Sequence, residues 1–120
     1  MQGIKTFIPT KNKVSYIQAL LRVGFDTIDF GSFVSPKAIP QMQDTAEVLA
    51  QLDLSQTTSK LLAIIANTQG AASAAEHEPI QYLGFPFSIS ENFQMRNTHK
   101  TIAESLITLE EILEIADKKN

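Results

Sequence analysis

Cysteine and tryptophan are both absent from this 120-residue chain. Without cysteine, disulfide bonds, thiolate zinc sites and thiol nucleophiles are excluded. Basic residues are also few: ten lysines and arginines stand against thirteen aspartates and glutamates, which gives a net charge of -3. This balance provides no general attraction to nucleic acid or to anionic membranes. Apolar runs stay short, and none approaches the ~18 residues that a membrane span needs. We therefore predict a cytoplasmic protein with no nucleic-acid or membrane partner.

What is present suffices for one globular domain over residues 1–120. Hydrophobic residues make up 43% of the chain, which is an ordinary share for a soluble protein, and the length allows a real core. Apolar stretches of strand length occur at 25–30, 61–66 and 80–87. The second of these is continuously apolar, which is typical of a strand covered on both faces.

Four helices are expected around these stretches. Thr10 and Asp44 precede two of them as candidate N-caps, and the small residues of 71–78 form a third. Thr101 and Glu104 have the spacing of a capping box before the last helix. An order in which about three strands alternate with four helices predicts an α/β fold with a parallel sheet.

The most informative stretch is TIDFGSFVSPKAIPQM, residues 27–42. The predicted apolar strand ends close to Asp29. A polar loop follows from residue 31, and a helical pattern begins after it. In α/β enzymes this order presents chemistry at the carboxyl ends of strands. Asp29 could act as a general acid or base, or it could cap the loop that follows. Ser32 could bind a substrate oxygen or simply close that loop.

Further polar residues stand where the later strands are expected to end. Asn67 follows the second strand and could orient a ligand or cap the next helix. Ser90 and Asn97 belong to the polar segment 88–98, which we expect to be a loop after the third strand. Because the carboxyl ends of parallel strands meet at one edge of a sheet, Asn67 and Ser90 are expected to share a face with Asp29 and Ser32.

The segment SFVSPKAIPQM, residues 32–42, closely resembles the corresponding segment of 3-hydroxy-3-methylglutaryl-CoA (HMG-CoA) lyases. The likeness continues through DTAEVL at 44–49, and weaker matches follow at 67–70 and 90–97. It spans essentially the whole chain and keeps its order. The resemblance implies a partial (β/α)₈ TIM barrel with an open sheet, equivalent to the N-terminal part of such a lyase.

The resemblance also implies a carbon–carbon lyase. Members of this family cleave HMG-CoA to acetyl-CoA and acetoacetate with a divalent cation, usually Mg²⁺ or Mn²⁺. Asp29 would be the catalytic residue, at a position where the family has a glutamate. The acyl-CoA substrate would be bound by Gln2, Ser32, Asn67 and Asn97. The alternative is a catalytically inactive truncated product or an acyl-CoA-binding remnant.

The metal ligands are not expected within this chain. By the resemblance, an Arg-Asp pair would lie immediately before Met1. The family's His-x-His ligands, its metal-binding asparagine and its glycine-loop cysteine would lie beyond Asn120. The two histidines present, His77 and His99, lack the paired spacing of a metal site. We therefore expect the chain to be inactive alone and to form a homo-oligomer or pair with a complementing chain.

Overall fold

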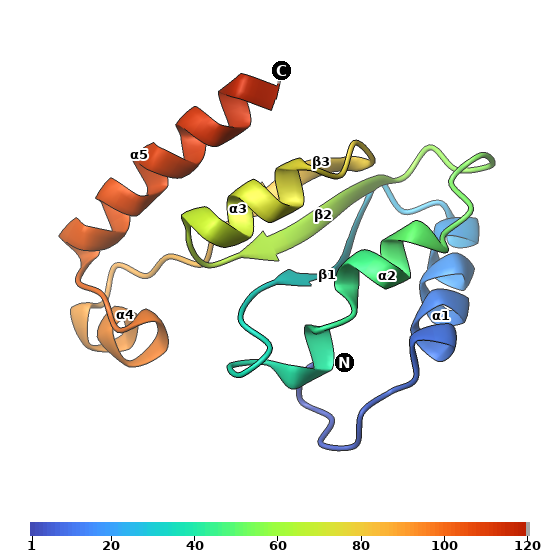
Figure 1. Cartoon of the computed structure of the whole chain (residues 1–120), viewed down its shortest axis with the longest axis horizontal. Coiled ribbons are helices and arrows are strands. Elements are labelled where there is room, and N and C mark those ends of the chain that lie inside the picture. The colour runs from blue at the N-terminus through green and yellow to red at the C-terminus, as the bar shows by residue number, and fades with distance from the viewer. Residues whose placement is uncertain (120) are drawn as a thin grey trace.

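The computed structural model describes residues 1–119, and a small parallel sheet lies at its centre. Its strands are β1 (Thr27–Phe33), β2 (Lys60–Ile65) and β3 (Ile80–Gly84), in the order β1-β2-β3 (Figure 1). Helices connect consecutive strands, which is the usual way to join parallel neighbours. The predicted α/β fold with an open parallel sheet is confirmed.

The four predicted helices are present, and the structure adds a fifth. The predicted ones are α1 (Thr10–Val23), α2 (Thr45–Ala50), α3 (Thr68–Ala75) and α5 (Ile102–Lys119). The loop predicted over 88–98 is wrong, because this segment contains α4 (Glu91–Thr98). Ser90 caps α4 by accepting a hydrogen bond from the Phe93 N–H at 3.3 Å. Within residues 1–119, no helix is long and apolar enough to cross a membrane.

Of two predicted helix caps, the one at Thr10 is wrong, and the one at Asp44 is confirmed in position but not in its side-chain hydrogen bond. Thr10 lies inside α1, whose N-cap is Pro9, and Asp44 stands at the N-cap of α2 without a side-chain hydrogen bond to that helix. The two side chains contact each other instead, with the Thr10 hydroxyl donating to Asp44 Oδ2 at 2.8 Å. The capping box before α5 is confirmed: the Thr101 N–H donates to the Glu104 carboxylate at 2.8 Å, and the Thr101 hydroxyl accepts from the Glu104 N–H at 3.1 Å.

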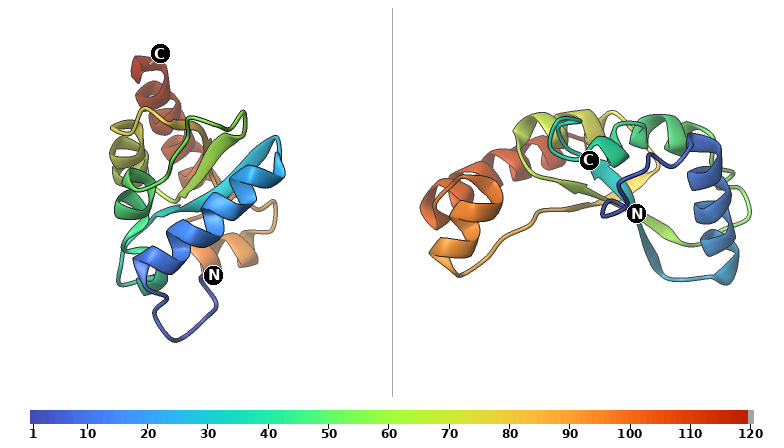
Figure 2. Two further views of the ribbon diagram at one scale, coloured as in Figure 1. Left: turned by 90° about the vertical axis from the view of Figure 1, so that its right-hand side faces the viewer. Right: turned by 90° about the horizontal axis from the view of Figure 1, so that it is seen from below.

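The main core lies between the sheet and the helices on one of its faces, where Figure 2 shows α2 and α3. Leu61, Ala63 and Ile65 alternate along β2 toward this face and are buried. They pack in one cluster with Ala71 and Ala74 of α3. The small alanines allow α3 to lie close to the sheet, as the run of small residues indicated.

The opposite face of the sheet is less well covered. Leu62 and Ile64 are only half-buried there, and Tyr82 is 43% exposed. Leu106, Ile107 and Leu113 on α5 are also exposed. We expect the isolated chain to self-associate, to bind a complementary chain or to be only marginally stable, because exposed apolar surface favours association.

Size-exclusion chromatography with light scattering, combined with thermal melting, checks this expectation. A monodisperse monomer of 13.2 kDa with a high and cooperative melting temperature would contradict it. Such a result would show that the chain covers its apolar surface without a partner.

Candidate functional site

A β-bulge in β1 determines which side chains face the site. The register between β1 and β2 shifts between Asp29 and Gly31, so that Asp29 is paired with Leu62 and Ser32 with Ile64. Paired residues of parallel strands point to the same face. Asp29 and Ser32 therefore share one face although they are three positions apart, a spacing that places residues on opposite faces of a regular strand.

The position of Asp29 within its strand differs from the prediction. The strand was expected to end near residue 30, but β1 continues to Phe33, so Asp29 lies in its interior. The loop predicted from residue 31 begins only after Phe33. The bulge explains the difference, because it lets the strand continue past Gly31 while both polar side chains stay on the uncovered face.

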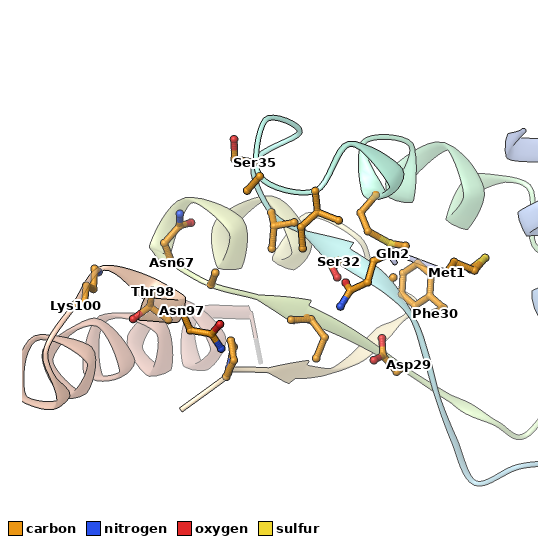
Figure 3. A pocket seen from close by; sticks show the side chains of 18 residues that line it. Met1, Gln2, Asp29, Phe30, Ser32, Ser35, Asn67, Asn97, Thr98 and Lys100 are labelled. Atoms are coloured by element: carbon orange, nitrogen blue, oxygen red, sulfur yellow. The ribbon is translucent and has the colours of Figure 1, made fainter. Parts of the chain in front are cut away.

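A cavity of about 770 Å³ opens on this side of the molecule (Figure 3). The five residues to which the lyase resemblance gives a role all line it: Gln2, Asp29, Ser32, Asn67 and Asn97. They come from the N-terminal segment, from β1, from the residues after β2 and from α4. The volume lies within the range of about 300–1,000 Å³ that is typical of small-molecule sites. Ser90, which was expected on the same face, caps α4 and is not among the lining residues.

Asn67 has a structural role as well as a place in the cavity. Its Oδ1 accepts a hydrogen bond from the Gly70 N–H at 2.8 Å, which caps α3. The capping interpretation is therefore confirmed. The same residue lines the cavity (Figure 3), so the cap fixes the orientation of an amide that faces the site.

Lys100 is the lining residue of most consequence that sequence reasoning missed. Its Nζ donates to the Thr108 hydroxyl, a neutral partner, at 2.6 Å. Figure 3 shows Lys100 and Asp29 at opposite ends of the cavity. The cavity therefore carries a positive charge at one end and a carboxyl group at the other. The available signal was a lysine directly before the capping box of α5, but no local pattern indicated that this residue lines the cavity.

The Asp29 side chain is exposed to solvent, and neighbouring protein atoms take up part of the space around its carboxyl group. Desolvation raises the pKa of Asp29 above its usual value, and a hydrogen bond from the Gly31 N–H and the positive charge at the Met1 amino group oppose the shift in part. A raised pKa means that the folded state disfavours the ionised form. The carboxylate therefore costs stability once the pH has risen through its folded pKa.

We expect Asp29→Asn to raise the unfolding midpoint slightly at pH 7. This advantage should shrink as the pH falls through the raised folded pKa, and it should be lost well below about 4, where the wild-type side chain is protonated in both states. Asp53→Asn is the matched control, for which we expect the opposite change in stability. Hydrogen bonds from the Ser55 hydroxyl and N–H lower the pKa of Asp53, so this variant should lose stability at pH 7 and recover at low pH. Denaturant unfolding at several pH values tests both, and equal pH profiles for the two variants would contradict the assignment.

The described residues do not form a site for a divalent cation. Residues 1–119 contain no group of three or more histidine, cysteine, aspartate and glutamate side chains that could hold a metal ion. Among the lining residues, Asp29 is the one carboxylate. Mg²⁺ takes about six ligands, mainly oxygen atoms, and keeps several waters among them. Asp29 alone would supply at most one or two of these ligands, so the lining contains no preformed protein ligand set.

Solved structures establish the class of fold to which this sheet belongs. The HMG-CoA lyase from Brucella melitensis superposes with a TM-score of 0.90 and 32% identity, over 98% of this chain and 41% of the lyase. The HMG-CoA lyase from Acinetobacter baumannii in complex with coenzyme A and 3-methylmalate gives a TM-score of 0.86 and 34% identity, over 94% of this chain and 36% of that one. The open sheet is thus part of a (β/α)₈ barrel, as predicted.

Curated proteins specify the kind of barrel. Hydroxymethylglutaryl-CoA lyase YngG of Bacillus subtilis is 31% identical over 120 residues, which is all of this chain and 40% of YngG. The mitochondrial hydroxymethylglutaryl-CoA lyase of Bos taurus is 35% identical over 118 residues, 97% of this chain and 35% of the relative. The chain is HMG-CoA lyase-like over its whole length, and it spans two fifths or less of these two relatives. No protein-family model matches it.

Proposed function

We propose that this chain forms part of the active site of a carbon–carbon lyase that cleaves an acyl-CoA of the HMG-CoA type to acetyl-CoA and acetoacetate. One observation carries the proposal: five side chains assigned from the lyase resemblance, although distant in sequence, line one cavity. A matched lyase structure in complex with coenzyme A and 3-methylmalate supports an acyl-CoA as the ligand class. Residues 1–120 would act as a single partial-barrel domain.

In this proposal Asp29 is the acid–base or electrostatic group, and its raised pKa brings it closer to a neutral working pH. Gln2 and Ser32 hydrogen-bond substrate oxygens, Asn67 and Asn97 form the remaining polar wall, and the ammonium group of Lys100 pairs with an anionic group of the substrate.

In the reaction a base removes the proton of the substrate's tertiary hydroxyl group. That oxygen becomes the ketone oxygen of acetoacetate as the neighbouring C–C bond breaks, and the electron pair passes to the enolate of acetyl-CoA. The enolate then takes up a proton. The family resemblance implies Mg²⁺ or Mn²⁺ in the complete enzyme, but no ligand in this chain is assigned to it, since residues 1–119 lack a suitable cluster.

The isolated chain is expected to show no measurable release of acetoacetate from HMG-CoA, with or without added Mg²⁺ or Mn²⁺. One carboxylate in the cavity leaves most of the cation's coordination sphere to be filled. A coupled assay for acetoacetate measures the result, with intact Bacillus subtilis lyase as the positive control. Metal-dependent turnover by the purified chain would contradict this expectation.

A chimera tests the proposed function. In it, this chain replaces the matching 120 residues of the Bacillus subtilis lyase, so that the lyase supplies the rest of the barrel. The proposal predicts metal-dependent release of acetoacetate. Because Asp29 is one methylene shorter than the glutamate expected by resemblance, the chimera is also assayed as Asp29→Glu. A folded chimera that is inactive in both forms would refute the proposal.

The second candidate is a catalytically inactive acyl-CoA-binding remnant, and the lack of a metal-ligand cluster in residues 1–119 favours it for the chain alone. An active chimera would count against it. A homo-oligomer or a complementing chain remains the proposed form of association. The cytoplasmic location stays a prediction, because relatives named cytoplasmic and relatives named mitochondrial both match.

A further inference from the structure

The N-terminal segment forms part of the cavity wall but has little structure of its own. Met1 and Gln2 line the cavity, yet residues 1–9 form neither a helix nor a strand. A turn closed by the Ile4 N–H and the Met1 carbonyl oxygen, 3.0 Å apart, folds the first residues back. The position of this wall therefore depends on contacts made by other elements.

The side-chain amide of Gln41 makes these contacts. Its Nε2 donates to the carbonyl oxygens of Ile4 at 2.9 Å and Thr6 at 3.0 Å. Its Oε1 accepts from the N–H of Ile8 at 2.8 Å. Gln41 is 4% exposed. Its buried amide therefore forms three hydrogen bonds with the main chain of the segment, as the backbone of a neighbouring strand would.

A buried ion pair holds Gln41 in place. Lys13 of α1 is 2% exposed, and its Nζ lies 2.6 Å from Asp44 Oδ1 and also donates to the Gln41 carbonyl oxygen. The same ammonium group lies 4.1 Å from the centre of the Phe7 ring, within the range of a cation–π contact. Separating such a pair leaves an uncompensated buried charge, so the pair ties α1 to the start of α2.

We infer that Gln41 is a positioning residue: Lys13, paired with Asp44, holds its main-chain carbonyl oxygen, and its side-chain amide fixes the N-terminal segment so that Gln2 faces the cavity. The functional part of this inference rests on the proposed function, because it takes the cavity to be the substrate site. The structural part stands on the hydrogen bonds alone. It also explains why Asp44 does not cap α2: its carboxylate is used by Lys13 and Thr10.

Trypsin tests the structural part directly, because the bond after Lys5 lies between the two carbonyl groups that Gln41 holds. In Gln41→Met, which has a similar length but no amide, cleavage after Lys5 should accelerate at least tenfold. Cleavage after Arg96, in α4, should change less than twofold and reports global unfolding. Gln41→Glu keeps an acceptor but loses both donors, and it should also expose Lys5.

The matched control is Gln43→Met, the same change two residues along on an exposed side chain, and it should leave both cleavage rates within twofold of wild type. Unchanged cleavage after Lys5 in both Gln41 variants would overturn the inference. Equal acceleration after Lys5 and Arg96 would also overturn it, since this would show a general loss of stability instead of release of the segment.

Kinetics of the chimera test the functional part. Gln41→Met should lower kcat/KM about tenfold, mainly through KM, while Gln43→Met stays within twofold of the parent. If the parent chimera is inactive, the proposed function fails while the trypsin result still decides the role of Gln41 in holding the segment. If the parent is active and Gln41→Met has unchanged kinetics, the positioning role for the substrate site is refuted.

Discussion

Asp29→Ala in the chimera is expected to lower kcat about 100- to 10,000-fold, the range that a positioned acid or base contributes. The residue lines the cavity, its pKa is raised by desolvation, and the bulge in β1 aims it to the same face as Ser32. Steady-state rates of acetoacetate release measure the effect. Because the lost group acts in the transition state, kcat should fall far more than the affinity for substrate.

Asp26→Ala is the matched control, because Asp26 precedes the same strand and its side chain is 83% exposed. Its only ion pair among the described residues is with Lys60 at 3.8 Å, and exposed pairs contribute little. This variant should keep activity within about twofold of the parent chimera. Equal losses in the Asp26 and Asp29 variants would show that Asp29 has no special role in the chemistry.

Gly70→Ala is expected to destabilise the chain by about 3 kcal/mol, at the upper end of the usual cost of overpacking. A Cβ at this position would lie 2.3 Å from the Phe33 carbonyl oxygen, which belongs to the backbone of β1 and cannot rotate away. Helix propensity alone predicts the opposite sign, since alanine is favoured over glycine by about 1 kcal/mol in a helix. We expect the steric clash between α3 and β1 to outweigh the gain in helix propensity.

Denaturant unfolding of wild type and variant measures this effect. Gly3→Ala is the control, because no atom lies within 4 Å of a Cβ built at Gly3, and its stability should stay within about 0.5 kcal/mol of wild type. A Gly70→Ala variant as stable as wild type would mean that α3 does not pack on β1 as closely as described.

The sheet could be predicted because each strand is an apolar run bounded by polar residues, and alternation with helices leaves few topologies. The site residues followed from the lyase resemblance and from their places after strands. The faces to which the side chains of β1 point could not be predicted. A regular strand would place Asp29 and Ser32 on opposite faces, and Gly31 alone does not indicate a bulge. Only the pairing with β2 shows it.

The pairing of Lys13 with Asp44 could not be predicted either. Thirty-one positions separate them, and each residue has an ordinary local interpretation, one as a solvated lysine and the other as a helix cap. The helix α4 was missed because its residues are mostly polar, with Gln94 as the one buried side chain. In these cases the structure depends on contacts between segments that local patterns do not describe.

A crystal structure of the chimera with coenzyme A and 3-methylmalate, the ligands of a matched lyase structure, would show whether the cavity binds substrate. We expect 3-methylmalate to lie in the cavity, with its oxygen atoms within hydrogen-bonding distance of Ser32 or Gln2 and with Asp29 beside it. Clear density for the ligand at a place that none of these side chains reaches would contradict the claim that this cavity is part of a lyase active site.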